Sequence, residues 1–241
     1  MTEIIFTEYV QGLGEVYRAC APLDEQIRTF NQERLSFVDV RDTSLIRLNG
    51  KNRGYTRTCS APIYRKDSRV IVARTSPLIT NLEMALFAVN RHRISNYAVF
   101  DDSVYSYWEK IIKEDKGKRP EDRRAIFLSS RDDFEIDKES DEARFFWRDT
   151  RERYFNEFAN EIHCLQIPVD IVDSSNGTIV NHVWFGNASS CTIDLRGKGL
   201  HEEYRAFGYK ETSETPFRKN APVGKLRERE EAPNGRLVLK D

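Results

Sequence analysis

The stretch "RAIFLSSR" at residues 124–131 has a near twin in "VDIVDSSNG" at residues 169–177, and these two stretches indicate how the central part of the chain folds. In each, an apolar run leads into paired serines next to charged residues. The run 125–128 is apolar on both faces, which is typical of a strand in the middle of a sheet. Aromatic residues at helical spacing lie between 140 and 162, and the apolar stretch 164–172 follows. This order of strand, helix and strand predicts a right-handed crossover that lays the two strands parallel in one sheet.

Short apolar runs continue towards the C-terminus. Pro168 cannot donate to a strand ladder, so it favours an edge or bulge position for the second strand. Residues 178–185, 191–196 and 204–209 then read as further strands separated by turns. We expect these strands to form a C-terminal β meander.

Towards the N-terminus the spacing changes twice. Residues 4–20 place apolar side chains at helical spacing, and a second helical stretch covers 23–30 after a break at Pro22. Between 38 and 75 the apolar runs are short and separated by turn residues. They predict antiparallel strands at three places, residues 45–48, 62–64 and 70–73.

Two more helices are expected before the central strand. Thr80 and Glu83 have the spacing of a capping box, and the apolar stripe that follows predicts a helix ending near His92. Asp101 or Asp102 can cap the next helix, whose stripe includes Trp108.

The fold class that follows is α+β (mixed α/β), with N-terminal helices, a small antiparallel β region, and a central mixed sheet with one βαβ crossover and a C-terminal β meander. We expect a single globular domain over residues 1–210. Its parts are a helical N-terminal part, a basic β region and an α/β core, at residues 1–37, 38–75 and 76–210. Residues 211–241 contain few core-forming side chains, so we expect a peripheral or flexible tail there.

Composition sets limits on the function. The formal net charge is −1, so overall charge favours neither nucleic acid nor membranes as partners. The four cysteines form no CxxC pair and suit a reducing compartment. No apolar run approaches the roughly 18–20 residues that cross a bilayer, and the first twenty residues do not resemble a signal peptide. We therefore expect a soluble, cytoplasmic protein without membrane contacts.

The first candidate site is a basic β-turn. Residues 41–74 carry nine cations and two anions, a local charge of +7. Within them, "GKNRGYTRT" combines cations for phosphates with an aromatic ring for stacking. The predicted ligand-binding residues are Lys51, Arg53, Tyr55 and Arg57. The alternatives are an ordinary solvated turn, or that this segment faces residues 101–161, which carry a local charge of −5, and cancels that charge within the fold.

The second candidate site lies at the strand ends of the crossover. Ligands tend to bind beyond the carboxyl ends of parallel strands, where hydroxyls and a guanidinium can hold a phosphate or carboxylate. The predicted residues are Ser129, Ser130, Arg131 and Asp173, the last of which can orient a water molecule or a ribose hydroxyl. The alternative is that the serines cap turns and that Arg131 pairs with a neighbouring aspartate.

His182 is a candidate general base. In "IVNHVWF" it shares a strand face with Val180 and Trp184, so the imidazole would stand beside an aromatic wall. The alternative is a hydrogen-bonded histidine on a half-buried sheet. The four histidines match no metal-ligand spacing, so we predict no metal site. No GxSxG, Walker-type, GxGxxG or HExxH motif occurs, and the sequence identifies no cofactor.

Three hypotheses for the function follow, and the sequence does not decide whether the protein is an enzyme. The leading one is binding of a phosphate-bearing partner, a nucleic acid or a nucleotide, through the basic β-turn. The second is a phosphate-ester hydrolase or nuclease with its site at the strand ends and His182 as base. The third is a non-catalytic protein-interaction or assembly module, which an exposed apolar patch would favour.

Overall fold

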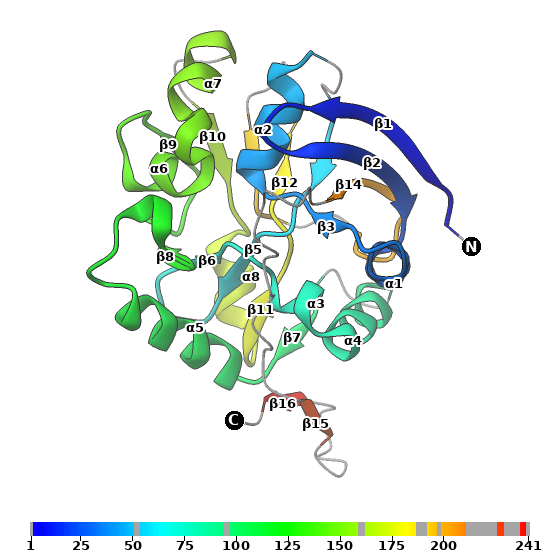
Figure 1. The fold of residues 1–241 in the computed structure, drawn as a ribbon. Coiled ribbons are helices and arrows are strands. Elements are labelled where there is room, and N and C mark those ends of the chain that lie inside the picture. The colour runs from blue at the N-terminus through cyan, green and yellow to red at the C-terminus, as the bar shows by residue number, and fades with distance from the viewer. Residues whose placement is uncertain are drawn as a thin grey trace.

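A computed structural model of the chain describes residues 2–50, 54–93, 97–158, 162–186, 192–196 and 199–210, and two further strands at 226–228 and 237–239 (Figure 1). The described residues combine helices with a mixed sheet and an antiparallel sheet. The expected α+β fold class is confirmed. No helix in these ranges is long and apolar enough to span a membrane.

The larger sheet has nine strands, in the order β1-β2-β14-β4-β12-β13-β10-β9, with β3 beside β14. Its pairs are antiparallel except for β10 with β13 and β14 with β4. The strand bounds are β1 (Ile4–Val10), β2 (Gly14–Ala21), β3 (Ser36–Phe37), β4 (Thr56–Arg57), β9 (Phe134–Ile136), β10 (Ile162–Leu165), β12 (Trp184–Phe185), β13 (Thr192–Asp194) and β14 (Tyr204–Lys210).

The smaller sheet is antiparallel, in the order β7-β11-β5-β6-β8. Its strands are β5 (Ala61–Tyr64), β6 (Ile71–Ala73), β7 (Val99–Phe100), β8 (Ala125–Phe127) and β11 (Thr178–Val180). A separate pair, β15 (Leu226–Glu228) and β16 (Leu237–Leu239), lies within the predicted tail. The other tail residues lie outside the described ranges, so the tail stays a prediction.

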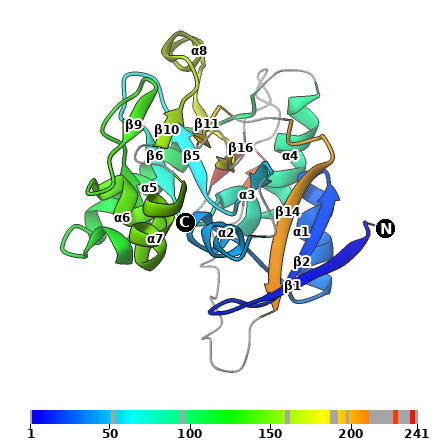
Figure 2. The same ribbon diagram turned by 90° about the horizontal axis from the view of Figure 1, so that it is seen from above.

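The helices surround the two sheets. They are α1 (Leu23–Gln32), α2 (Val40–Leu48), α3 (Pro77–Thr80), α4 (Leu82–His92), α5 (Ser103–Glu114), α6 (Asp141–Trp147), α7 (Arg151–Phe158) and α8 (Val169–Ser174), with 3₁₀ turns at Pro120–Asp122 and Arg148–Thr150. Figure 2 shows α5, α6 and α7 gathered on one side and β1, β2 and β14 on the other.

The smaller sheet has apolar side chains on both faces. Ile63 and Ala73 pack with α3, α4 and α5, while Tyr64 and Val72 belong to a second cluster that includes α6, α7 and the strands β10, β12 and β13. Because both faces are covered, these short strands read as continuous apolar runs in the sequence.

The predicted helix at 4–20 is wrong. The residues form the antiparallel hairpin β1–β2, whose turn contains Gly12 and Gly14 with φ of 81° and 102°. Apolar residues four apart share a face in a strand as well as in a helix, so their spacing alone was ambiguous. The β-branched and aromatic residues of this stretch favour the strand. The helix predicted at 23–30 is confirmed as α1.

The strand predicted at 45–48 is also wrong, because these residues form the last turn of α2. The helix begins in a capping box, in which Asp39 accepts from the Asp42 N–H at 3.0 Å and Asp42 accepts from the Asp39 N–H at 3.3 Å. The strands predicted at 62–64 and 70–73 are confirmed as β5 and β6.

The crossover joins two sheets instead of two strands of one sheet. The strand β8 pairs with β6 alone among the described strands, at an edge, whereas β10 lies in the larger sheet. The stretch 169–174 is the short helix α8, since Pro168 leaves the ladder and starts a helix instead. Residues 178–185 also divide between sheets, as β11 and β12. The last strands therefore do not form a simple meander: β14 returns to lie between β2 and β4.

Candidate functional site

The predicted strand-end residues contact one another, but as an ion pair. The guanidinium of Arg131 donates to Asp173 at 2.6 Å, and this bond is the main cause of the lowered pKa of Asp173. The Ser129 N–H donates to Glu142 at 2.9 Å, and the Ser130 hydroxyl accepts from the Asp132 N–H at 3.0 Å. Arg131, Asp173 and the Ser130 hydroxyl thus have partners within the fold, and the Ser130 contact is of the kind that the alternative interpretation expects for a serine at a turn.

His182 lies in the interior with no exposed surface. Its Nδ1 is 3.0 Å from the Thr58 carbonyl oxygen, so Nδ1 carries the proton and Nε2 is left as an acceptor. Burial, followed by the charge of Arg57, lowers the pKa of His182 to about 3. Within the described ranges no hydrogen bond joins His182 to Arg131 or Asp173. A catalytic role for these residues stays a prediction, without contacts that unite them.

The residues predicted for the basic β-turn differ in their exposure to solvent. Tyr55 is 38% exposed, whereas Arg57 is fully buried. The Arg57 guanidinium donates to Gln26 Oε1 at 2.6 Å and lies 5.0 Å from the Trp184 ring centroid. Burial lowers the pKa of Arg57 to about 9, which leaves it charged at neutral pH. Lys51 and Arg53 lie outside the described residues, so their role in this site remains a prediction.

Four other cations of residues 41–74 contact side chains of the segment 101–161. Arg41 pairs with Asp149 at 2.8 Å, which is the kind of contact that the cancellation alternative expects. The other three contact neutral rings: Arg65 lies 4.0 Å from the Tyr105 ring, Arg69 4.5 Å from the Phe127 ring, and Arg74 4.8 Å from the Phe145 ring. Among the described residues these four arginines each have a side-chain partner, so the local charge of +7 overstates the number of unengaged cations.

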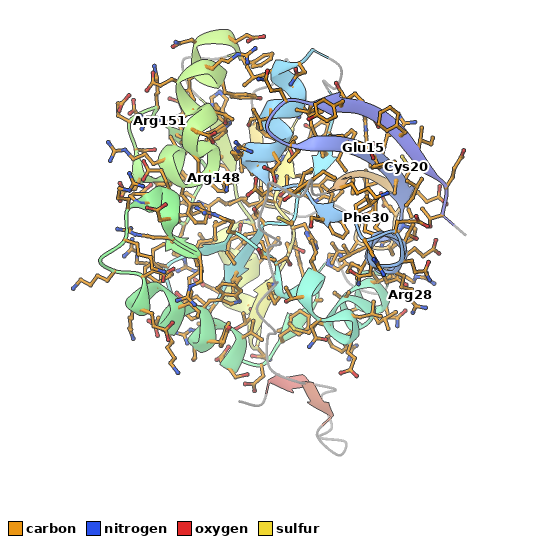
Figure 3. All side chains as sticks on the ribbon, in the orientation of Figure 1. Glu15, Cys20, Arg28, Phe30, Arg148 and Arg151 are labelled. Atoms are coloured by element: carbon orange, nitrogen blue, oxygen red, sulfur yellow. The ribbon has the colours of Figure 1, made fainter. Side chains whose placement is uncertain are left out.

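A cavity of about 300 Å³ lies where the C-terminal end of α1 meets β3, β14 and α3. The rings of Phe30 and Phe37 lie 4.5 Å apart, tilted by 54°, and form an aromatic part of its wall (Figure 3 labels Phe30). The lining residues are Phe30, Asn31, Arg34, Leu35, Ser36, Phe37, Cys59, Thr75, Ile79 and Tyr209. Apolar and aromatic walls with a few polar groups are the usual composition of a small-molecule site.

Gly208 makes this wall possible. A Cβ at Gly208 would meet Leu35 Cβ at 3.0 Å and the Phe30 ring at 3.1 Å. The missing side chain allows α1 to lie close to the larger sheet, and Phe30 is fully buried as a result. The sequence contains no motif that marks this contact, since it joins residues about 180 positions apart.

Arg34 lines the same cavity in an unusual backbone conformation. It follows α1 with φ of 55°, a left-handed conformation that favours glycine. The Leu35 N–H donates to the Phe30 carbonyl at 2.8 Å, and the Arg34 N–H donates to the Asn31 carbonyl at 3.3 Å. These two bonds are those of a Schellman motif, with Arg34 at the position where glycine is usual. The side chain is exposed, and no carboxylate of the described residues pairs with it.

A second group of polar atoms is buried near β11 and β12. Among the described residues His182 Nε2 has no hydrogen-bond partner, and His92 interacts with the Asn181 side chain. Burial, followed by the charge of His201, lowers the pKa of His92 to about 4. Both buried imidazoles are therefore neutral at pH 7. No cluster of three or more metal-ligating side chains occurs among the described residues.

No family model matches the chain, and no curated protein matches its sequence. Among solved structures, the fold is similar to that of a chain described as "Accommodation of massive sequence variation in Nanoarchaeota by the C-type lectin fold". The two chains are 10% identical, the match covers 87% of this chain and 98% of that chain, and the TM-score is 0.54. The chain is therefore similar in fold to a C-type lectin-fold protein, and at this identity the likeness concerns the fold alone.

Proposed function

We propose that the protein is a binding protein whose cavity between α1, β3 and β14 takes a small aromatic molecule that carries a carboxylate or phosphate group. The observation that carries the proposal is Arg34, a non-glycine residue held at a glycine position on the cavity rim. Such a residue costs of order 1 kcal/mol of stability. A residue in a backbone conformation that its type disfavours is expected mainly at functional sites, where its side chain is needed.

The cavity composition specifies the ligand class. Phe30 and Phe37 offer aromatic surface for a ring, and the Arg34 guanidinium can hold a planar anion through two parallel hydrogen bonds. A volume of about 300 Å³ is at the lower end of ligand sites, so a single-ring compound fits better than a larger one. The structural neighbour is described as accommodating massive sequence variation, which is consistent with a similar fold carrying a cavity of its own composition here.

The test is titration of benzoate and phenyl phosphate, followed by NMR chemical shifts and calorimetry. We expect a dissociation constant of about 0.1–1 mM for a ligand of this size. The Arg34→Gln variant should bind about tenfold or more weakly, because a charge-assisted hydrogen bond contributes about 1.5–3 kcal/mol. Arg28→Gln, on the exposed side of α1, is the matched control and should bind like the wild type.

The Arg34→Gly variant separates function from stability. Its free energy of unfolding in urea should rise by about 0.5–1 kcal/mol, because glycine adopts this backbone conformation without strain. It should also lose binding of the ligand, because the guanidinium is gone. Absence of shifts at Phe30, Phe37 and Tyr209 with both compounds, or equal binding by Arg34→Gln, contradicts the proposal.

Binding of a phosphate-bearing partner at the basic β-turn is a second candidate. One observation favours it: the Arg205 guanidinium lies against Gly54, which adds a cation next to the residue that precedes the exposed Tyr55. Binding of labelled single- and double-stranded nucleic acid across a salt series tests it. Steeply salt-dependent binding that is lost in a Lys51→Ala, Arg53→Ala variant supports it, and no binding at low salt retires it.

A further inference from the structure

Exposed apolar side chains concentrate on the strand β1. The described residues include five large apolar side chains that are exposed, and three of them lie on β1: Ile5 at 40%, Phe6 at 56% and Tyr9 at 65%. The other two are Tyr55 and Leu82, on different elements. Single exposed apolar residues need no explanation, but a group on one strand indicates a contact surface.

The position of β1 in the sheet adds backbone groups to this surface. The strand ends the order of the larger sheet, and among the described strands only β2 pairs with it (Figure 1). Its outer edge therefore presents N–H and C=O groups that another strand can pair with. An edge strand that also carries exposed apolar side chains fits an extended segment of a partner.

The register of β1 against β2 limits where such a segment pairs. The pairing is regular from Ile4 to Phe6 and shifts between Phe6 and Glu8. A bulge bends the strand and interrupts the ladder, so the regular stretch before it is the part available for pairing. This stretch includes two of the three exposed apolar residues, Ile5 and Phe6.

We propose that a second copy of the chain occupies this edge, with residues 4–6 of the two copies paired antiparallel about a two-fold axis at Ile5. This register places each Phe6 opposite the Ile4 of the other copy. An aromatic residue opposite a β-branched one is a favourable cross-strand pair, and the symmetry forms it twice. Glu3 lies opposite Thr7, so no like charges face each other.

The neighbouring registers are less favourable. Pairing about Phe6 places Glu8 opposite Ile4, although Glu8 is 3% exposed and its side chain already lies within the fold. Pairing about Ile4 places Thr2 opposite Phe6, although the Thr2 hydroxyl donates to Glu25 on α1 at 2.8 Å. The axis at Ile5 is the one that uses the exposed residues and leaves these contacts intact.

Sedimentation velocity over a concentration series tests the association. We expect a dimer with a dissociation constant of about 10–100 μM, as a small interface implies. The Phe6→Lys variant should raise this constant about tenfold or more. The matched control is Leu82→Lys, which alters an exposed apolar residue of α4 and should dimerise like the wild type. A monomer at all concentrations, or a dimer unaffected by Phe6→Lys, overturns the proposal.

Cross-linking tests the register. Residues directly opposite in a sheet have Cα atoms about 4.5–5.5 Å apart, which suits a disulfide. In a background with Cys20→Ser and Cys191→Ser, Ile5→Cys should form a disulfide between copies under mild oxidation. Glu3→Cys should not, because its two copies would lie about 14 Å apart. Equal cross-linking of both variants overturns the register.

Discussion

Arg57 and His182 have interior positions that their types alone do not predict. Both lie at or beside the pair formed by β4 and β12, and both are fully buried. The Arg57 guanidinium donates to Gln26 and lies near the Trp184 ring, and His182 Nδ1 donates to the Thr58 carbonyl. A charged residue in a turn-rich stretch is normally exposed, so the sequence favoured a surface role for Arg57. Arg57 is buried instead because its strand β4 pairs with β12 at Trp184, a residue distant in sequence.

The buried histidines predict a pH dependence of stability. The folded-state pKa values of His182 and His92 are about 3 and about 4, below the roughly 6.5 of an unfolded histidine. Because the unfolded chain binds these protons first, their contribution is complete above about pH 6.5 and falls as the pH drops towards 4, by at most about 1.4 kcal/mol per pH unit and group.

Urea unfolding between pH 7.5 and about pH 5 checks this slope, since carboxylates titrate mainly below that range. The His182→Asn variant keeps a donor for the Thr58 carbonyl and should show a shallower slope than the wild type. His163→Asn, which removes an imidazole that is 56% exposed and lies 3.5 Å from Glu135, is the comparison variant. An unchanged slope in His182→Asn contradicts the assignment.

At the scale of the element, helix ends are set by individual capping hydrogen bonds, and the spacing of residues in the sequence locates these caps only to within a residue or two. The sequence placed a capping box at Thr80 and Glu83, one residue from the actual cap of α4. Asn81 Oδ1 accepts from the N–H groups of Glu83 and Met84 at 3.0 and 3.2 Å. The Thr80 hydroxyl instead donates to the carbonyls of Pro77 and Ser76, in the first turn of α3, at 3.3 and 3.4 Å. The helix itself was predicted because its apolar stripe is periodic.

The two neighbouring residues offer a direct comparison. Asn81→Ala removes the cap of α4 and should lower the free energy of unfolding by about 1 kcal/mol. Thr80→Ala removes only long hydrogen bonds and should cost clearly less. Urea titration of both variants measures the difference, and a larger loss in Thr80→Ala would show that the box at Thr80 and Glu83 caps the helix in solution.

At the scale of the whole molecule, Arg47 connects elements that are far apart in sequence. From α2, its guanidinium donates to Tyr154 on α7 at 3.1 Å, to the Phe185 carbonyl on β12 at 3.1 Å, and to the Gly186 carbonyl. It also lies 3.9 Å from the Phe185 ring centroid. Arg47 is 1% exposed, so water cannot reach these carbonyls and donate hydrogen bonds in place of the guanidinium.

Removing this connection should therefore destabilise the fold. Arg47→Met leaves buried carbonyls without donors, and we expect a loss of about 2–4 kcal/mol. Arg119→Met, which breaks an ion pair between two exposed side chains, Arg119 and Asp122, should cost clearly less. Chemical unfolding of the two variants, with circular dichroism to confirm folding, compares them. Equal losses of unfolding free energy in the two variants would contradict a stabilising role of the Arg47 hydrogen bonds.

The sequence by itself determined the elements whose pattern is local. The helices α4 and α5 and the strands β5, β6 and β14 follow from periodicity, β-branched residues and turn residues, because these act within a few positions. The hairpin β1–β2 was missed, since a spacing of four residues suits both kinds of element. Only the tertiary structure decided which sheet β8 and β10 join, that Arg57 and His182 are buried, and that Arg34 meets Phe37 and Tyr209 around a cavity. These features depend on contacts between residues far apart in the chain, and local patterns carry no information on which distant partners will bury a given face.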